Sequence, residues 1–363
     1  MLDVAIVGGG LAGVSLAASL AQTTGLNIAL FEANNRLGGR ILCTQPSVEG
    51  SSRFDLGPTW VWPHEQTHLA RFIQHHGLNV FPQHQTGDSL YLAGRGEAPQ
   101  RFPDQQGYSG AYRIEGGAQY LLDVLIPSIP SNHIHLNRRL IKLTDQGDHV
   151  ELAFASQSKE KRVKAQRAVL CLPPRLLTQQ VQFEPALDDK LVQLFNATPT
   201  WMAGHGKVIV QYEQAFWRQE GLSGNAFANY PGVILGEIFD ACNSTGSTAA
   251  LGGFFALPAP LRQQYRDDLE ALVLEQLFYL FGPKAAQATA VYQQDWFQEP
   301  NTAVAEDANI PPSHPKYGHQ WLQLDHWYEK LWFAASETDP RYGGYLEGAL
   351  GAAARMINSF QTI

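Results

Sequence analysis

The first apolar runs of the chain predict a strand, a helix and a second strand. Residues 4–7 form a β-branched apolar run, and a glycine-rich turn at 8–13 joins it to a helix-like segment that reaches Leu20. A second apolar run follows at 27–32. This order is typical of a βαβ unit within a parallel sheet.

Later apolar runs predict three more strands and two helices. Strands are expected at 168–172, 207–212 and 331–334, the first because its continuous apolar run stops at two prolines. Residues 261–281 and 346–360 carry apolar side chains at helical spacing and predict helices. Three stretches rich in Gln, Gly, Pro and Ser are candidate crossings between domains: 44–52, 82–107 and 300–318.

Composition and charge narrow the class of protein. The 363 residues include 26 Lys+Arg and 34 Asp+Glu, which gives a net charge of −8, and 44% are hydrophobic. Such a chain can bury large cores, and without a basic run it is not expected to bind nucleic acid. The 3 cysteines are widely spaced and offer neither a disulfide framework nor a CxxC pair. With no secretory signal and no membrane-spanning apolar run, we expect a cytoplasmic protein without a membrane partner.

Gly8, Gly10 and Gly13 form a GxGxxG turn between the first strand and the first helix. The first glycine permits the tight turn, the second lets the backbone approach a pyrophosphate, and the third lets the helix pack closely on the strand. Glu32 ends the next strand, 19 residues after Gly13, where a carboxylate can accept hydrogen bonds from ribose hydroxyls. The pattern predicts a dinucleotide site, and its acidic residue disfavours NADP, which leaves NAD and FAD.

A second glycine pair follows Glu32 and favours FAD. Arg36, Gly38, Gly39 and Arg40 bring more backbone and more fixed positive charge toward the pyrophosphate than nicotinamide cofactors usually receive. At this point the chain resembles the flavin-containing amine oxidase family, which carries E-x3-R-x-GGR here. The resemblance is to its monoamine oxidase-like members, of which this chain would be a compact one.

The resemblance extends over the whole chain. Stretches similar to family motifs follow in order at 54–57, 115–117, 168–174, 207–217, 333–338 and 344–349. They imply an α/β fold in which a Rossmann-like FAD-binding domain is interleaved with a smaller α+β substrate domain. The expected limits are 1–67, 110–178 and 299–363 for the FAD-binding domain, and 68–109 and 179–298 for the substrate domain with its shortened cap.

The resemblance also implies a set of FAD-binding residues and no metal site. Glu337 would bind the ribityl chain, and Arg40 and Gly39 would hold the pyrophosphate region. The full set expected at the cofactor is Gly8, Gly10, Leu11, Ala12, Gly13, Glu32, Ala33, Arg36, Gly38, Gly39, Arg40, Gly57, Pro58, Thr59, Leu140, Trp296, Ser336, Glu337, Tyr345 and Leu346.

In this family a hydride passes to the flavin from a carbon next to nitrogen, and the resulting imine hydrolyses. By resemblance, Lys207 would stand near flavin N5 and assist reoxidation by molecular oxygen, which gives hydrogen peroxide. Tyr345 would form an aromatic wall that steers the lone pair of a neutral amine. Two alternatives stay open at this stage: a flavin-dependent dehydrogenase or desaturase that uses another electron acceptor, and a catalytically idle FAD-binding scaffold.

The chain departs from the monoamine oxidases in ways that change the expected site. No cysteine follows Trp296, so the FAD should be bound non-covalently. The second aromatic wall has no clear counterpart, and Glu306 in that loop either pairs with a cationic substrate or is a solvated residue. The chain is short between 54 and 113, so the cap should be small and the site more open.

Several other polar and aromatic side chains lie outside the family motifs. Trp60 and Trp62 follow the 54–57 turn and are candidates for the substrate entrance. Arg71, Arg95 and Arg101 are available to meet a carboxylate but lie in no motif. The histidine pairs lack a third ligand at metal spacing and are expected to be surface or packing residues: His64 with His68, and His133 with His135.

Overall fold

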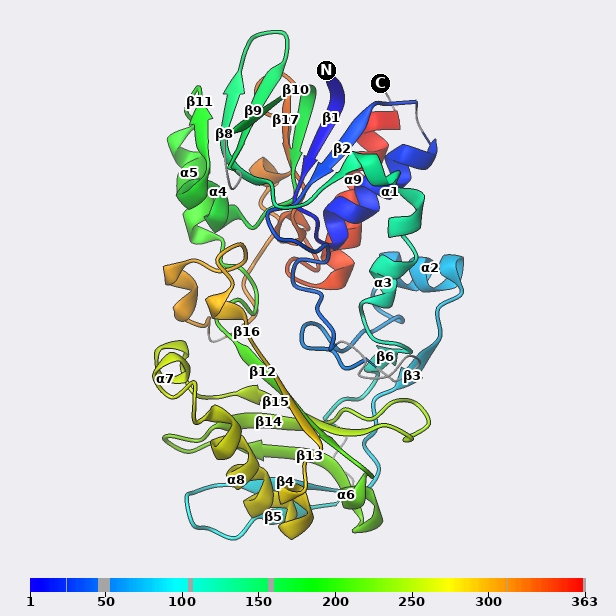
Figure 1. Cartoon of the computed structure of the whole chain (residues 1–363), viewed down its shortest axis with the longest axis vertical. Helices are drawn as coiled ribbons and strands as arrows, with labels where there is room; N and C mark the ends of the chain where they lie inside the picture. Colours follow the sequence, from blue (N-terminus) through cyan, green and yellow to red (C-terminus); the bar gives the residue numbers. More distant parts are fainter. Residues whose placement is uncertain (24, 45–52, 104–106, 156–159, 312, 362–363) are drawn as a thin grey trace.

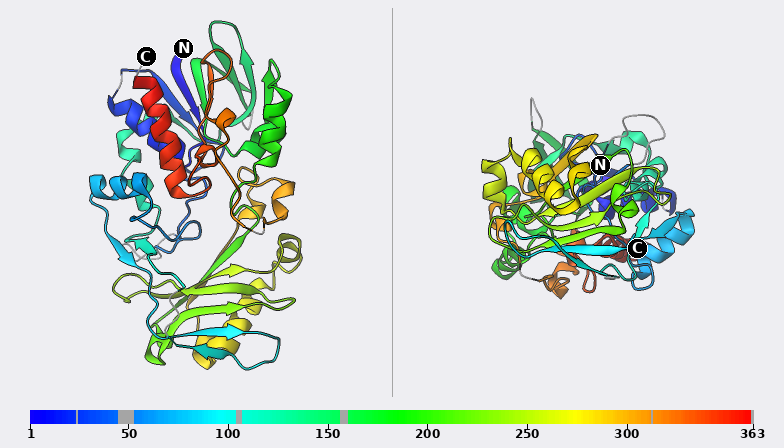
Figure 2. Two further views of the ribbon diagram at one scale, coloured as in Figure 1. Left: turned by 180° about the vertical axis from the view of Figure 1, so that it is seen from behind. Right: turned by 90° about the horizontal axis from the view of Figure 1, so that it is seen from below.

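A computed structural model describes residues 1–23, 25–44, 53–103, 107–155, 160–311 and 313–361. The chain forms an elongated molecule with one large sheet toward each end, and both termini lie beside the first sheet (Figure 1). The view from behind shows the same division, with the chain passing several times between the two sheets (Figure 2).

The first sheet has 8 strands in the order β11-β8-β9-β10-β1-β2-β7, with β17 paired to β10. β1 runs parallel to β2 and to β10, with Val4 opposite Ile28 and Ala5 opposite Ala168. The predicted βαβ opening is therefore confirmed. The strands are β1 (Leu2–Val7), β2 (Ile28–Phe31), β7 (Ile134–His135), β8 (Arg139–Asp145), β9 (Val150–Ala155), β10 (Lys161–Leu170), β11 (Gln182–Glu184) and β17 (Leu331–Phe333).

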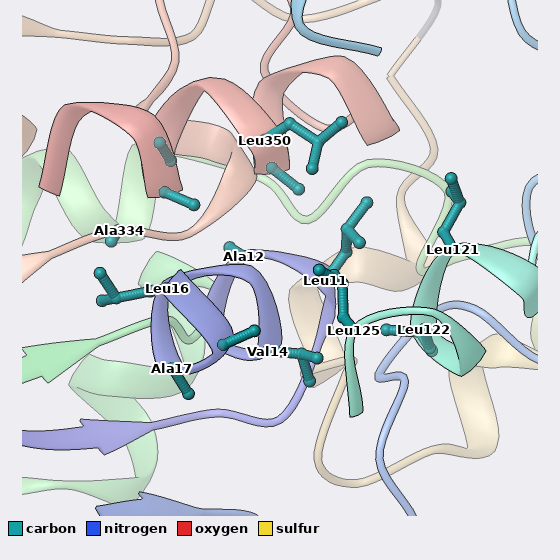
Figure 3. Close-up of a cluster of buried hydrophobic side chains, with 14 of the residues drawn as sticks. Leu11, Ala12, Val14, Leu16, Ala17, Leu121, Leu122, Leu125, Ala334 and Leu350 are labelled. Atoms are coloured by element: carbon teal, nitrogen blue, oxygen red, sulfur yellow. The ribbon is translucent and has the colours of Figure 1, made fainter. Parts of the chain in front are cut away.

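Helices from distant parts of the chain cover the two faces of the first sheet. On one face, α1 (Leu11–Thr23), α2 (Thr67–His76), α3 (Tyr120–Asp123) and α9 (Leu346–Gln361) bury one apolar cluster. Figure 3 shows side chains of this cluster, among them Leu16 of α1, Leu121 of α3 and Leu350 of α9. The other face packs on α4 (Pro174–Gln180) and α5 (Asp189–Ala197).

The second sheet has 7 strands in the order β16-β12-β15-β14-β13-β4-β5. One face packs on α8 (Leu269–Phe281), where Val273 and Leu277 are buried, and the other face meets Trp60 and Tyr108. Its strands are β4 (Asp88–Leu92), β5 (Gln100–Phe102), β12 (Gly206–Tyr212), β13 (Leu222–Ala228), β14 (Leu235–Asp240), β15 (Ala249–Phe255) and β16 (Ala290–Asp295).

The remaining described elements are short. β3 (Val80–Pro82) pairs with β6 (Tyr112–Ile114) in the region between the two sheets (Figure 1). The short helices are α6 (Phe216–Gln219), α7 (Ala259–Gln264) and the 3-10 turns Ile126–Ser128, Ser131–His133, Pro283–Ala286, Trp296–Gln298, Ala305–Ala308, Gln320–Leu322 and Ser336–Thr338. The limits that the sequence suggested for the two domains stay a prediction.

Two predicted elements differ from the structure. The helix expected over 261–281 is divided into α7 and α8, because the backbone leaves the helical conformation at Tyr265, with φ of −99° and ψ of 17°. Arg262 of α7 is bound to Asp295 at the end of β16 at 2.9 and 2.6 Å. The stretch 82–107, expected to be a loop, contains β4 and β5. Leu90 and Leu92 of β4 are buried in the core of the second sheet, and β4 pairs with β13, far away in the sequence.

Candidate active site

The glycine-rich turn brings the backbone of three segments together at the N-terminus of α1. A Cβ atom at Gly13 would lie 1.9 Å from the carbonyl oxygen of Gly8, so only glycine allows the helix to pack this closely on β1. The amide of Gly38 donates a hydrogen bond of 2.7 Å to the carbonyl oxygen of Gly9. The second glycine pair therefore lies directly against the first, as the motif predicted.

Glu32 joins these segments through its carboxylate. Its Oε2 accepts a hydrogen bond of 2.6 Å from the amide of Gly9, and its Oε1 accepts one of 2.8 Å from the amide of Asn34. The residue is 6% exposed and lines the cavity described below. A carboxylate that is held at the end of β2 in this way can also accept bonds from a ribose.

The two arginines after Glu32 have different surroundings. The guanidinium of Arg36 donates to the carbonyl oxygens of Gly39 and Ile41 at 2.9 and 3.1 Å, so it braces the backbone of its own loop. Arg40 lines the cavity and pairs with the fully buried Glu337 at 2.8 Å. Burial is the largest single effect on Arg40 and lowers its pKa. The charge and hydrogen bond of Glu337, with smaller effects of Tyr317 and Asp307, together outweigh burial, and the pKa rises above its usual value.

A single cavity of about 620 Å³ runs past the glycine turn, the two arginine segments and the second sheet. All sequence-predicted site residues line it except Gly13, Arg36 and Glu337. Gly13 and Arg36 act on the cavity through the backbone that they position. Glu337, expected on the ribityl chain, has its carboxylate against Arg40 and the Ser336 hydroxyl, which donates to it at 2.9 Å.

Lys207 lies in β12 and presents its ammonium to the cavity from the second sheet. It is 1% exposed, and its Nζ donates to the carbonyl oxygen of Gly57 at 2.9 Å and to the hydroxyl of Thr59. The rings of Phe239 and Phe254 lie 5.4 and 5.5 Å from Nζ. Burial lowers the pKa of Lys207 to about 8, although the nearby Asp55 opposes the shift.

Aromatic side chains form the wall of the cavity around Tyr345. The ring of His314 stacks on Tyr345 with centroids 4.8 Å apart, and the rings of Trp62 and Trp201 lie 6.5 Å from it. Trp60 and Trp62 both line the cavity, as their position after the 54–57 turn suggested. Tyr345 is therefore part of a larger aromatic cluster, of which Trp62 and Trp201 also line the cavity.

Polar groups on the second sheet were missed by sequence reasoning. Glu237 of β14 lines the cavity, and its Oε1 accepts a hydrogen bond of 2.6 Å from the hydroxyl of Tyr108. Burial raises the pKa of Glu237, while Tyr108 and Lys207 act to lower it. His205 also lines the cavity, and burial, with a smaller effect of Arg262, lowers its pKa to about 4. His205 is two positions from Lys207, but no motif marks it or Glu237.

Other candidates from the sequence lie away from the cavity. Glu306 is exposed and accepts a hydrogen bond of 2.8 Å from Gln179, so it is a surface residue. Arg71, Arg95 and Arg101 are absent from the cavity lining. Within the described ranges, no group of three or more His, Cys, Asp or Glu side chains could hold a metal ion. Of the helices in the described part of the chain, none has the length and apolar character needed to cross a membrane.

The residues present fit a flavin dinucleotide. The first turn of α1, which the structure describes in full, carries no acidic side chain, so the helix N-terminus and its free amides favour a diphosphate. The far end of the cavity is walled by Tyr345, Trp296 and Phe254, which suit a planar ring system. Cys171 lines the cavity at the glycine turn, and Cys43 and Cys242 are buried outside its lining. No described cysteine therefore lines the far end, and the FAD site needs no covalent link.

The fold and the cavity together define a dinucleotide-binding α/β protein with an aromatic pocket. The family comparison is more specific. Residues 87–357 match the model of the flavin containing amine oxidoreductases, and residues 6–76 match that of an NAD(P)-binding Rossmann-like domain. The chain therefore belongs to the flavin-containing amine oxidoreductase family, and it is an FAD-dependent, amine oxidase-like enzyme. The expected Rossmann-like α/β fold is confirmed.

Known relatives are similar over most of their length at low identity. A flavin-containing amine oxidase of Danio rerio is 22% identical, over 97% of this chain and 84% of the relative. A putrescine oxidase of Kocuria rosea is 23% identical, over 88% of this chain and 87% of the relative.

Solved structures of two amine oxidases share the fold. Putrescine oxidase bound to putrescine superimposes with a TM-score of 0.78 at 19% identity, covering 100% of this chain and 99% of the other. Cyclohexylamine oxidase from Brevibacterium oxydans superimposes with a TM-score of 0.76 at 20% identity, covering 99% of both chains.

Proposed function

We propose that the protein oxidises the C–N bond of a small amine, with FAD as the hydride acceptor and molecular oxygen as the final electron acceptor, giving hydrogen peroxide. The substrate carbon loses a hydride and the nitrogen loses a proton, so that an imine forms. Water then hydrolyses the imine to a carbonyl compound and an amine. Membership of the amine oxidoreductase family and the amine substrates named for two structural neighbours support this proposal.

One observation carries the proposal: the buried ammonium of Lys207 and the aromatic wall at Tyr345 line the same cavity as the dinucleotide turn. The aromatic wall excludes water and favours the neutral form of an amine, whose lone pair is needed to form the C=N bond. Lys207 would stabilise the negative charge that develops on oxygen as it is reduced. We assign Lys207 and Tyr345 to catalysis and the other predicted site residues to FAD.

Glu337 and Arg36 have supporting roles in this proposal. Because Glu337 is fully buried against Arg40, it would hold the arginine in place beside the diphosphate. Arg36 would keep the second glycine pair in its cavity-facing conformation through its bonds to the loop carbonyls. A cytoplasmic location and non-covalent binding of FAD complete the proposal.

Anaerobic mixing of the purified protein with a panel of amines tests the proposal. We expect the flavin absorbance to disappear at about the rate of turnover. When air is admitted, the absorbance should return and hydrogen peroxide should form. Loss that air does not reverse would favour a dehydrogenase or desaturase with another acceptor. A bound flavin that no amine reduces would favour the idle scaffold.

A further inference from the structure

Tyr345 follows two glycines, so its own backbone does little to fix the ring. Gly344 has a φ of +84°, in the left-handed region that favours glycine, and a Cβ atom there would lie 2.6 Å from the Cβ atom of Trp201. The Tyr345 hydroxyl has no hydrogen-bond partner among the residues that the structure describes. The orientation of the ring therefore depends on the aromatic side chains that pack against it.

His314 is the stacked partner of Tyr345. The centroids of the two rings are 4.8 Å apart and their planes differ by 21°. The rings of Trp62 and Trp201 lie 6.5 Å from Tyr345, at angles of 86° and 47°. Aromatic pairs in such geometries attract one another beyond the effect of burial alone. Of the described rings around Tyr345, that of His314 makes the closest contact with its face.

His314 is itself held in place on several sides. Its Nε2 lies 2.9 Å from the carbonyl oxygen of Gly343, which can only accept, so Nε2 carries a proton and donates. Its ring also packs on Trp201 and Tyr317, with centroids 4.7 and 5.3 Å away. A Cβ atom at Gly343 would lie 2.2 Å from that of Tyr317, so the glycine lets these groups close around His314.

The imidazole lies behind Tyr345 and not in the cavity. Tyr345 and Trp201 line the cavity, whereas His314 is absent from the part of the lining that the structure describes. The imidazole covers the stacked face of Tyr345 and leaves the rest of the ring to a bound amine. Without the imidazole, the Tyr345 ring could turn into the vacated space. The amine would then lose the surface that orients its lone pair and its C–H bond.

We propose that His314 is a positioning residue, which holds the ring of Tyr345 at the cavity wall by stacking behind it. His314 touches no substrate, and its effect on amine oxidation passes through Tyr345. This role needs the ring of His314, because the hydrogen bond to Gly343 only anchors that ring. The inference rests on the proposed amine oxidation and adds a residue that lies outside the motifs at 333–338 and 344–349.

Two substitutions separate the stacking of His314 from its hydrogen bond. His314→Phe keeps a ring against Tyr345 and loses the bond to Gly343, whereas His314→Gln keeps a donor for Gly343 and loses the ring. Each variant is mixed anaerobically, in a stopped-flow instrument, with a primary monoamine that reduces the flavin in the amine panel. The traces give the rate constant of flavin reduction and the dissociation constant of the amine.

The expected result is a loss of rate without a loss of binding. His314→Gln should lower the rate constant of flavin reduction roughly 5- to 10-fold, as for the loss of one aromatic pair. The dissociation constant of the amine should stay within about 2-fold of that of the wild type, because orientation affects the reaction more than it affects binding. His314→Phe should stay within about 2-fold of the wild type in both constants.

A double-mutant cycle shows whether His314 acts through Tyr345. Tyr345→Leu removes the aromatic ring and keeps an apolar side chain. In this background His314→Gln should have no further effect on flavin reduction, because no ring is left to position. A general structural effect would instead lower the rate constant by the same factor in both backgrounds. His76→Ala is the matched control, because His76 contacts the ring of Phe72 at 4.3 Å outside the cavity lining and should leave flavin reduction unchanged.

Two further measurements do not depend on amine oxidation. Crystal structures of the FAD-bound variants should show the Tyr345 ring in its wild-type orientation in His314→Phe and displaced toward the vacated space in His314→Gln. The rate constant for the reaction of the chemically reduced protein with oxygen should be unchanged in both variants, because Lys207 stays in place. Flavin absorbance and melting temperature check that each variant is folded and loaded.

The outcomes distinguish this inference from the proposed function. A His314→Gln variant with the wild-type rate constant of flavin reduction, or one whose effect persists in full without the Tyr345 ring, overturns the positioning role and leaves amine oxidation in place. If FAD is bound and no amine reduces it, the proposed function is overturned. The crystal structure of His314→Gln then decides the positioning role, which an unmoved Tyr345 ring would contradict.

Discussion

Replacing Lys207 with methionine should slow reoxidation of the flavin without weakening the fold. Methionine has a similar length and no charge, so the substitution removes the ammonium that lies 1% exposed beside the cavity. At an effective dielectric constant of about 20, a unit charge roughly 6 Å away stabilises a developing anion by about 3 kcal/mol. The bimolecular rate constant with oxygen should therefore fall roughly 100-fold.

The effect of this substitution on stability follows from the pKa of Lys207. Lowering the pKa from 10.5 to about 8 means that the charged form costs about 3 kcal/mol in the folded protein. This cost is present in full below pH 8 and is relieved as the pH rises from about 8 toward 10.5, because the unfolded chain then binds the extra proton. At pH 7 the free energy of unfolding of Lys207→Met should therefore equal or exceed that of the wild type.

Stopped-flow mixing of chemically reduced protein with oxygenated buffer measures the rate constant without any substrate. In the wild type it should decline as the pH rises through about 8, since Lys207 then loses its charge, and in Lys207→Met it should not depend on pH there. Lys142→Met, at a half-exposed surface ion pair with Glu184, is the matched control. Equal oxygen rate constants in wild type and Lys207→Met would refute the reasoning.

Three more predictions concern the cofactor site. Gly13→Ala should lower the FAD content and lower the free energy of unfolding by roughly 1–3 kcal/mol, because its Cβ would lie 1.9 Å from the Gly8 carbonyl oxygen. Gly25→Ala, with open space around its Cβ, is the control and should leave the melting temperature unchanged. Arg40→Met leaves the buried carboxylate of Glu337 without its partner, so the free energy of unfolding measured in urea should fall by roughly 3–5 kcal/mol. A fall no larger than that of Gly25→Ala would contradict this prediction. Acid precipitation should leave the flavin in the supernatant, and a yellow pellet would show a covalent link.

Local patterns were enough to predict the nucleotide half of the site. The spacing of Gly8, Gly10 and Gly13 and the position of Glu32 depend on contacts within one βαβ unit, whose geometry is the same wherever it occurs. The motifs named the arginines and Glu337 as well, but not their partners. That Glu337 faces Arg40 depends on two segments 297 residues apart meeting in space. The bonds of Arg36 to Gly39 and Ile41 are local, but they depend on a loop conformation that the motif does not specify.

The second sheet was harder to predict because its pairings are long-range. β4 is short and pairs with β13, and no local signal distinguishes it from a loop. Alternation along β14 shows that Glu237 and Phe239 share a face, but it does not show that this face meets the cavity rather than α8. Glu237 became visible as a site residue only when the register placed it in line with Lys207.

The balance of one turnover tests the central claim most directly. Purified protein with bound FAD is mixed in air with a limiting amount of a primary monoamine that reduces the flavin in the anaerobic panel, and oxygen uptake, peroxide and aldehyde are measured together. We predict that one oxygen is consumed, and one peroxide and one aldehyde are formed, for each C–N bond oxidised. Full loading with FAD, but no oxygen uptake and no aldehyde with this or any other amine, would contradict the assignment of the protein as an amine oxidase.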